Sequence, residues 1–125
     1  SLYDFGKQLG LAFQVVDDIL DFTSNDKQLG KPALNDLANG YLTAPALYSI
    51  EENPLLAELI KREFSFEGDL DKALEIINDS KAIIRSRQLA EKFAKASYEA
   101  ISWIPESSSK KALLDLPEYI LGRLY

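Results

Sequence analysis

The chain has 125 residues, enough for one domain or part of a larger one, with the composition of a globular protein. Its net charge of −6 argues against nucleic acid as a partner, because phosphate binding depends on clustered Lys and Arg. Neither Cys nor His occurs, which excludes disulfides, thiolate metal sites and imidazole chemistry. Any metal site must therefore use oxygen ligands, which suit Mg²⁺, Mn²⁺ or Ca²⁺.

No apolar run approaches the ~20 residues that a membrane-spanning helix needs, and no signal-peptide pattern opens the sequence. The chain also lacks Met and begins inside an apolar helical pattern. We therefore expect no membrane span, and we interpret the chain as a segment of a longer sequence.

Apolar residues recur at steps of three and four almost everywhere, and no stretch alternates with period two. This pattern predicts an all-α fold with about six or seven helices. In chain order, the expected helices cover about residues 2–23, 34–38, 46–51, 54–64, 70–78, 81–104 and 110–125.

Turn-forming residues set the expected breaks between these helices. A polar connector is expected over 24–32, and Asn39-Gly40 should stop the short helix that follows it. Asn53 should cap the next helix, where proline is welcome in the first turn. The helix over 81–104 is expected to be the longest, and Pro117 predicts an irregularity in the last one.

The first expected helix is apolar on most of its sides, yet it carries a narrow polar stripe. At about 100° per residue, one arc of roughly 80° holds several of its polar and small residues. They are Gly6, Gly10, Gln14, Asp17 and Asp21, with Asp18 just beside them. A helix that is apolar on most sides is normally buried, so the stripe is expected to face an interior cavity.

Three carboxylates within one turn repel one another and need a counter-charge. Two like charges about 5 Å apart cost some 3 kcal/mol at an effective dielectric constant near 20. Asp17 and Asp21 are spaced i and i+4, so they point the same way and can grip one divalent ion. Mg²⁺ is usually held by one or two carboxylates, waters and substrate phosphates. The alternative is a set of acids on a solvated face.

The run Phe13-Gln14-Val15-Val16-Asp17-Asp18-Ile19-Leu20-Asp21-Phe22 resembles the second aspartate-rich motif of the trans-prenyl (polyprenyl) diphosphate synthases. It follows a Gly-x-x-x-Gly pattern from Gly6, and Gly30-Lys31-Pro32, Asp36-Leu37 and Thr43-Ala44-Pro45 come after it in the order typical of that family. The resemblance is close over the first 50 residues, and the residues of these motifs are most similar to those of solanesyl-type synthases.

The resemblance implies the C-terminal part of a single all-α domain, an antiparallel helical bundle of the isoprenoid synthase type, usually dimeric. It implies a transferase that condenses isopentenyl diphosphate head-to-tail with an allylic diphosphate. The cofactor would be Mg²⁺, with Mn²⁺ possible, held between two aspartate motifs that face each other. The implied location is the cytoplasm, or a plastid or the cyanobacterial cytosol.

Carried over by position, Asp17 would be a direct Mg²⁺ ligand, and Asp18 and Asp21 would complete the site. Gln14 would orient substrate or metal-bound water, or it is a buried amide bonded to backbone. Lys31 would reach the diphosphate, or it is an ordinary solvated lysine.

Other positions carry weaker expectations. Asp36 would lie in the water shell of a metal or cap a short helix, and Arg123 would help to close the site. Arg85 and Arg87 are interpreted as surface residues, and Trp103 as core or dimer packing.

Some features of the family pattern are missing. Tyr41 stands where a basic residue is usual, and the first aspartate motif does not occur in this sequence. We therefore expect the isolated chain to show no measurable prenyl transfer. Two other functions remain open: a non-catalytic partner subunit of a heteromeric synthase, and an acidic helical interaction bundle.

Overall fold

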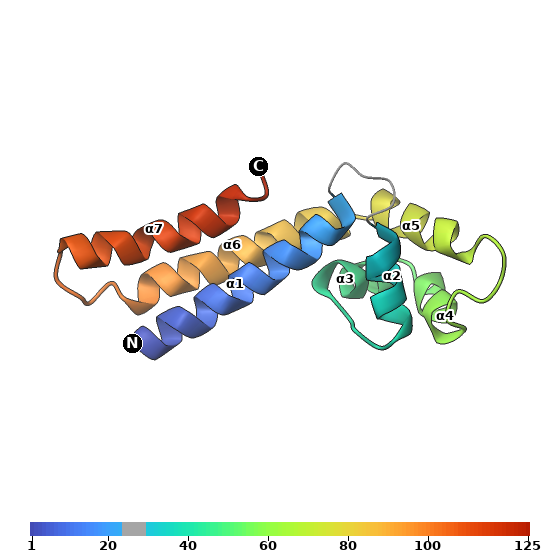
Figure 1. Ribbon diagram of the computed structural model, residues 1–125, viewed down its shortest axis with the longest axis horizontal. Coiled ribbons are helices and arrows are strands. Elements are labelled where there is room, and N and C mark those ends of the chain that lie inside the picture. The colour runs from blue at the N-terminus through green and yellow to red at the C-terminus, as the bar shows by residue number, and fades with distance from the viewer. Residues whose placement is uncertain (24–29) are drawn as a thin grey trace. The chain divides into compact units, whose positions relative to one another are not determined.

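The computed structural model describes residues 1–23 and 30–125, without the side chains of residues 30–32. These described residues form seven helices and no strand, which confirms the all-α prediction (Figure 1). The helices are α1 Leu2–Thr23, α2 Gly30–Ala38, α3 Ala44–Glu52, α4 Leu55–Lys61, α5 Asp69–Asp79, α6 Ala82–Ala100 and α7 Ser108–Gly122. None of them is both long and apolar enough to cross a membrane.

The bounds of α1 agree with the prediction, and the start of α2 corrects one. Residues 30–32 were expected to end a connector, but they form the first turn of α2. Proline is compatible with that turn, because its missing N–H would have no helical partner there. The rest of the expected connector, residues 24–29, lies outside the described residues.

The predicted stop at Asn39-Gly40 is confirmed in detail. Gly40 has a φ of 96°, and the backbone N–H groups of Gly40 and Tyr41 donate to the carbonyls of Leu37 and Asp36. This closing pattern at a helix C-terminus favours glycine, because only a residue without Cβ adopts a positive φ at little cost. The expected cap at Asn53 needs correction: α4 begins at Leu55 with Pro54 as its N-cap, although the side-chain oxygen of Asn53 does accept the N–H of Leu55 at 3.1 Å.

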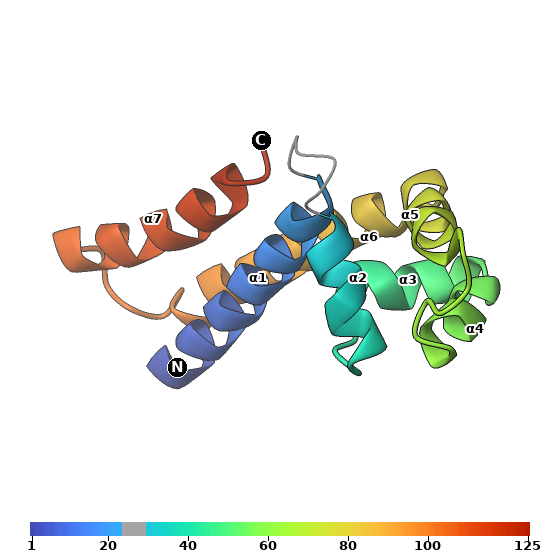
Figure 2. The ribbon, with the colours of Figure 1, turned by 45° about the vertical axis from the view of Figure 1, so that its right-hand side comes forward.

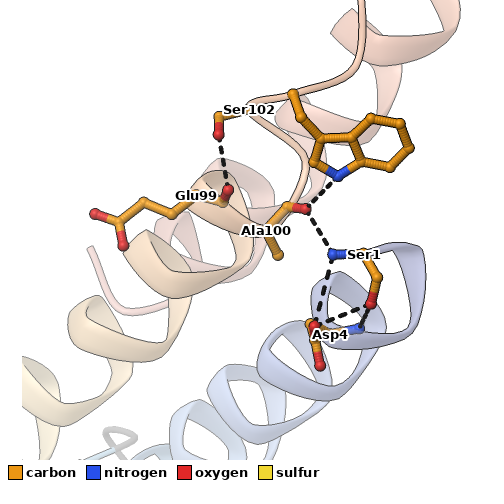
Figure 3. A network of polar contacts seen from close by, with 6 residues as sticks. Ser1, Asp4, Glu99, Ala100 and Ser102 are labelled. Carbon is orange, nitrogen blue, oxygen red and sulfur yellow. Dashed lines mark hydrogen bonds and ion pairs between the residues drawn. The ribbon is translucent and has the colours of Figure 1, made fainter.

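The expectation that the helix over 81–104 is the longest was wrong. It ends at Ala100 and has 19 residues, against 22 in α1. The carbonyl of Ala100 does not receive the N–H of Ile104, which donates to Ile101 instead. The Ala100 carbonyl instead accepts hydrogen bonds from the indole N–H of Trp103 and from the nitrogen of Ser1, each at 3.0 Å (Figure 3). The contact with Trp103 takes the place of the next helical hydrogen bond.

The chain packs as two compact units: residues 18–86 form one, and residues 1–17 with 87–125 form the other. In the first unit the short helices α2, α3, α4 and α5 gather around one apolar core, to which each of them contributes (Figure 2). The core residues are Leu34, Leu37, Ala46, Leu56, Leu59, Ala73, Ile76 and Ile77.

In the second unit, residues 1–17 of α1, residues 87–100 of α6 and helix α7 run in alternating directions (Figure 1). The Ser1 nitrogen meets the end of α6 at Ala100, which places the start of α1 beside that end (Figure 3). Several buried positions of this unit are small residues, which lets helix backbones approach closely. They are Ala12, Ala90, Ala94 and Ser97.

The loop before α7 is held by a buried lysine. The Nζ of Lys110 donates to the carbonyl of Ile104 at 2.7 Å and lies 3.0 Å from a carboxylate oxygen of Glu106. Ser107 caps α7 by accepting the backbone N–H of Lys110 at 3.0 Å. Pro117 lies inside α7 without ending it.

In residues 18–86, the turn that leads into α5 is held by one carboxylate. Asp69 is buried and accepts the Nε and Nη2 groups of Arg62 at 2.8 and 2.6 Å. It also accepts the backbone N–H of Phe66 at 3.1 Å. The hydrogen bond from Arg62 is the main cause that lowers the pKa of Asp69, with a smaller contribution from Phe66.

Asp69→Asn is expected to lower the melting temperature by several degrees at neutral pH and to have little effect in strong acid. The folded pKa of Asp69 lies below its unfolded value of about 4, so its stabilisation is present above that value. It is lost as the pH falls through the lowered folded pKa. Thermal denaturation between pH 2 and 7 measures this, with exposed Asp71→Asn as the control. An equal loss at every pH would contradict it.

Candidate functional site

The three predicted metal ligands lie on α1 in the spacing that the sequence predicted. Asp17 ends one compact unit and Asp18 begins the other, but both belong to the uninterrupted helix α1. The helix itself therefore sets their register with Asp21. Asp17 and Asp18 are half-buried, whereas Asp21 and Gln14 are exposed. The buried-amide alternative for Gln14 is therefore wrong, since its side chain reaches solvent.

The face of α1 that bears the stripe is open. A Cβ atom on Gly6 or Gly10 would meet no described atom within 4 Å, so the described residues do not enclose the expected cavity there. Phe13 on the same helix is 46% exposed, although burial on most sides was expected. The buried side chains of α1 are confined to the positions Phe5, Ala12, Val15, Val16 and Ile19.

Asp17 is paired with a cation from the other end of the sequence. The Nη1 of Arg123 lies 2.8 Å from Asp17 Oδ1, and both side chains are a little over one-third exposed. The guanidinium also lies over the ring of Phe13, one helical turn before Asp17, at 5.2 Å from its centroid. Arg123 is the residue that follows α7, so the end of α7 reaches the stripe.

Tyr125, two residues further on, is anchored to α6. Its hydroxyl donates to the carboxylate of Glu91 at 3.0 Å, and the guanidinium of Arg87 lies 5.9 Å from its ring centroid. The hydrogen bond to Glu91 is the main cause that raises the pKa of Tyr125. Both contacts lie within residues 1–17 and 87–125, the unit that also holds Asp17 and Arg123.

The donor chemistry of the stripe fits a hard divalent cation only in part. Within residues 1–23 and 30–125, no three carboxylates converge as a metal cage. What α1 offers is a pair of carboxylates at i and i+4, Asp17 and Asp21, with Asp18 beside them. One or two carboxylates completed by water and phosphate oxygens are the usual set for Mg²⁺. In this structure the counter-charge at Asp17 is the guanidinium of Arg123.

The sequence model of the polyprenyl synthetase family matches residues 1–77. A prenyl transferase of Synechocystis is 52% identical over 99% of this chain and 38% of its own length. The chloroplastic solanesyl diphosphate synthase 2 of Arabidopsis thaliana is 45% identical over 99% of this chain and 30% of its own. The chain belongs to the polyprenyl synthetase family. It spans less than half the length of these relatives, whose names agree with the predicted likeness to solanesyl-type synthases.

Solved structures of the polyprenyl synthetase family share the fold. The apo form of an Arabidopsis medium/long-chain length prenyl pyrophosphate synthase superposes with a TM-score of 0.82 at 40% identity, over 98% of this chain and 43% of that one. A polyprenyl synthase from Caulobacter crescentus, complexed with calcium and isoprenyl diphosphate, gives 0.73 at 33% identity, over 94% and 38%. The described helices thus have the fold of the corresponding part of these family members.

Two further predicted site residues of this chain, Lys31 and Asp36, belong to α2. Lys31 is in the first turn of α2, but its side chain lies outside what the structure describes. Asp36 is exposed near the end of α2, where its main-chain carbonyl accepts the N–H groups of Asn39 and Tyr41. Any role of Lys31 or Asp36 in holding the diphosphate therefore stays a prediction.

One interpretation of a residue outside the motif needs correction. Arg85, interpreted as a surface residue, is about one-third exposed, pairs with Glu51 at 3.0 Å and lies over the ring of Tyr48. Trp103 is not core, because it is 66% exposed and its indole N–H reaches a carbonyl. An amphipathic tryptophan at a helix end finds its hydrogen bond more easily at the surface than inside.

The contacts of Arg87 and Tyr125 were missed by the sequence analysis. The only available signals were an aromatic residue two positions after Arg123 and an Arg–Glu pair spaced i and i+4 on one helix. Neither signal indicates which distant residues meet.

Proposed function

We propose that this segment supplies one carboxylate arm of a polyprenyl diphosphate synthase that condenses isopentenyl diphosphate head-to-tail with an allylic diphosphate. In this proposal, Asp17, Asp18 and Asp21 bind Mg²⁺ that bridges to the diphosphate, and Lys31 and Gln14 contact the substrate side. The segment would form the C-terminal part of a single synthase domain in a homodimer, in a plastid or the cyanobacterial cytosol.

One observation carries this proposal: the acids of α1 lie on the open face of a helix whose opposite side is buried. On that face, Arg123 is the counter-charge of Asp17 at 2.8 Å. The related Caulobacter synthase was crystallised with calcium and isoprenyl diphosphate, which supports a divalent cation and a diphosphate as ligands of this family. Carboxylate oxygens are the ligand type that both Ca²⁺ and Mg²⁺ prefer.

The chemistry expected of this arm is positioning and charge compensation. Bound Mg²⁺ would stabilise the negative charge that develops on a departing diphosphate. The part of this chain is to hold Asp17 and Asp21 one helical turn apart on the same helix. The buried side chains Val16 and Ile19 fix the rotation of α1, and thereby the direction of both carboxylates.

A Mg²⁺ titration with pyrophosphate tests the proposal. The melting temperature of the chain should rise when both are present, because a ligand that binds only the folded state stabilises it. Asp17→Ala should abolish that rise. Asp115→Ala is the control, since Asp115 is an exposed acid on α7. A chain indifferent to Mg²⁺ and pyrophosphate would support the acidic interaction bundle instead.

A further inference from the structure

We propose that Arg123 and Tyr125 form a C-terminal clasp that occupies Asp17 in the metal-free chain and must move away before a divalent cation binds there. The proposal rests on the proposed function, since it assigns the metal to Asp17. The clasp and the metal compete for Asp17. Binding of a cation there therefore releases the end of α7.

The first observation is that Arg123 has two partners on α1, one charged and one aromatic. Its Nη1 lies 2.8 Å from Asp17 Oδ1, and its guanidinium carbon lies 5.2 Å from the ring centroid of Phe13. A planar guanidinium is suited to both contacts at once, because it donates hydrogen bonds in its plane and stacks through its face. The stacking holds Arg123 at the stripe even though the ion pair is partly solvated.

The second observation is that Tyr125, which follows Arg123 by two residues, makes contacts of its own. The Tyr125 hydroxyl donates to Glu91 at 3.0 Å, and Arg87 packs over the same ring. Both partners lie on α6, whereas the partners of Arg123 lie on α1. Two attachments on two helices fix the end of α7 more firmly than one ion pair would, because the second forms at high effective concentration.

The competition follows from distance and charge. A Mg²⁺ or Mn²⁺ ion bonds to a carboxylate oxygen at about 2.1 Å, while the guanidinium nitrogen already stands 2.8 Å from Asp17 Oδ1. Two cations this close repel each other strongly. A metal that binds Asp17 through Oδ1 therefore has to displace the Nη1 of Arg123, and any change that weakens the clasp should strengthen metal binding through that oxygen.

Mn²⁺ affinity in the presence of pyrophosphate tests this, measured by the loss of the free-ion electron paramagnetic resonance signal. Arg123→Gln should bind Mn²⁺ about two- to fivefold more tightly, because an ion pair whose side chains are over one-third exposed is weak. Tyr125→Phe, which removes only the hydroxyl of a side chain that is 79% exposed, should gain up to about twofold. Lys111→Gln removes an equal charge from the first turn of α7, far from the clasp, and should change little. Weaker or unchanged binding by Arg123→Gln overturns the proposal.

Hydrogen exchange at residues 119–125 separates this inference from the proposed function. Asp17→Asn should speed exchange there without any metal, because it removes the partner of Arg123, and saturating Mn²⁺ should do the same in the unmodified chain. If Mn²⁺ binds but exchange does not change, the clasp is wrong and the proposed function stands. If Asp17→Asn speeds exchange but neither chain binds Mn²⁺, the proposed metal role fails, and the competition proposed here fails with it.

Discussion

Asp17→Asn is expected to lower the turnover of a synthase that contains this segment by about 10²- to 10³-fold, the loss typical when one preorganised group that stabilises developing charge is removed. Asparagine keeps the size and one oxygen of the side chain but loses the negative charge that attracts Mg²⁺. Because Asp17 is over one-third exposed, the substitution leaves no buried group unpaired. The measurement is steady-state incorporation of labelled isopentenyl diphosphate.

The control for this prediction is Asp115→Asn, an exposed acid on α7. It should retain turnover within about twofold, since surface substitutions are usually near neutral. The isolated 125-residue chain supplies the baseline and is expected to give no product. Turnover of Asp17→Asn close to that of the unmodified enzyme, at saturating Mg²⁺, would remove Asp17 from the metal site.

Ile77→Ala is expected to destabilise the unit formed by residues 18–86 by about 2–5 kcal/mol, the range for truncating a fully buried isoleucine. Ile77 is inaccessible to solvent and belongs to the core that joins α2, α3, α4 and α5. The cavity left behind cannot collapse easily, because its neighbours come from four short helices that hold one another in place. Urea denaturation followed by circular dichroism measures the change.

Ile84→Ala is the matched control, because it removes the same atoms from a side chain that is 57% exposed. Its effect should stay within about 1 kcal/mol. Similar losses from the two variants would show that Ile77 does not lie in the core of that unit.

Local patterns explain which parts of the fold were predictable. The bounds of α1 follow from a long run of apolar residues at helical spacing. The stop at Gly40 was predictable because its φ of 96° is one that glycine adopts readily. The start of α2 was not, because Gly30-Lys31-Pro32 is compatible with both a turn and a first helical turn. The end of α6 was not predictable either, because helical spacing does not indicate that the indole N–H of Trp103 donates to the carbonyl of Ala100.

The sequence by itself determined the spacing of Asp17, Asp18 and Asp21, because helical geometry relates residues one turn apart whatever packs around them. It also determined that any metal site must use oxygen ligands, since the chain has no His or Cys. Only the tertiary structure decided that Arg123 meets Asp17 and that Tyr125 meets Glu91. Those partners lie 106 and 34 positions apart, and a contact over such a separation depends on how whole helices pack.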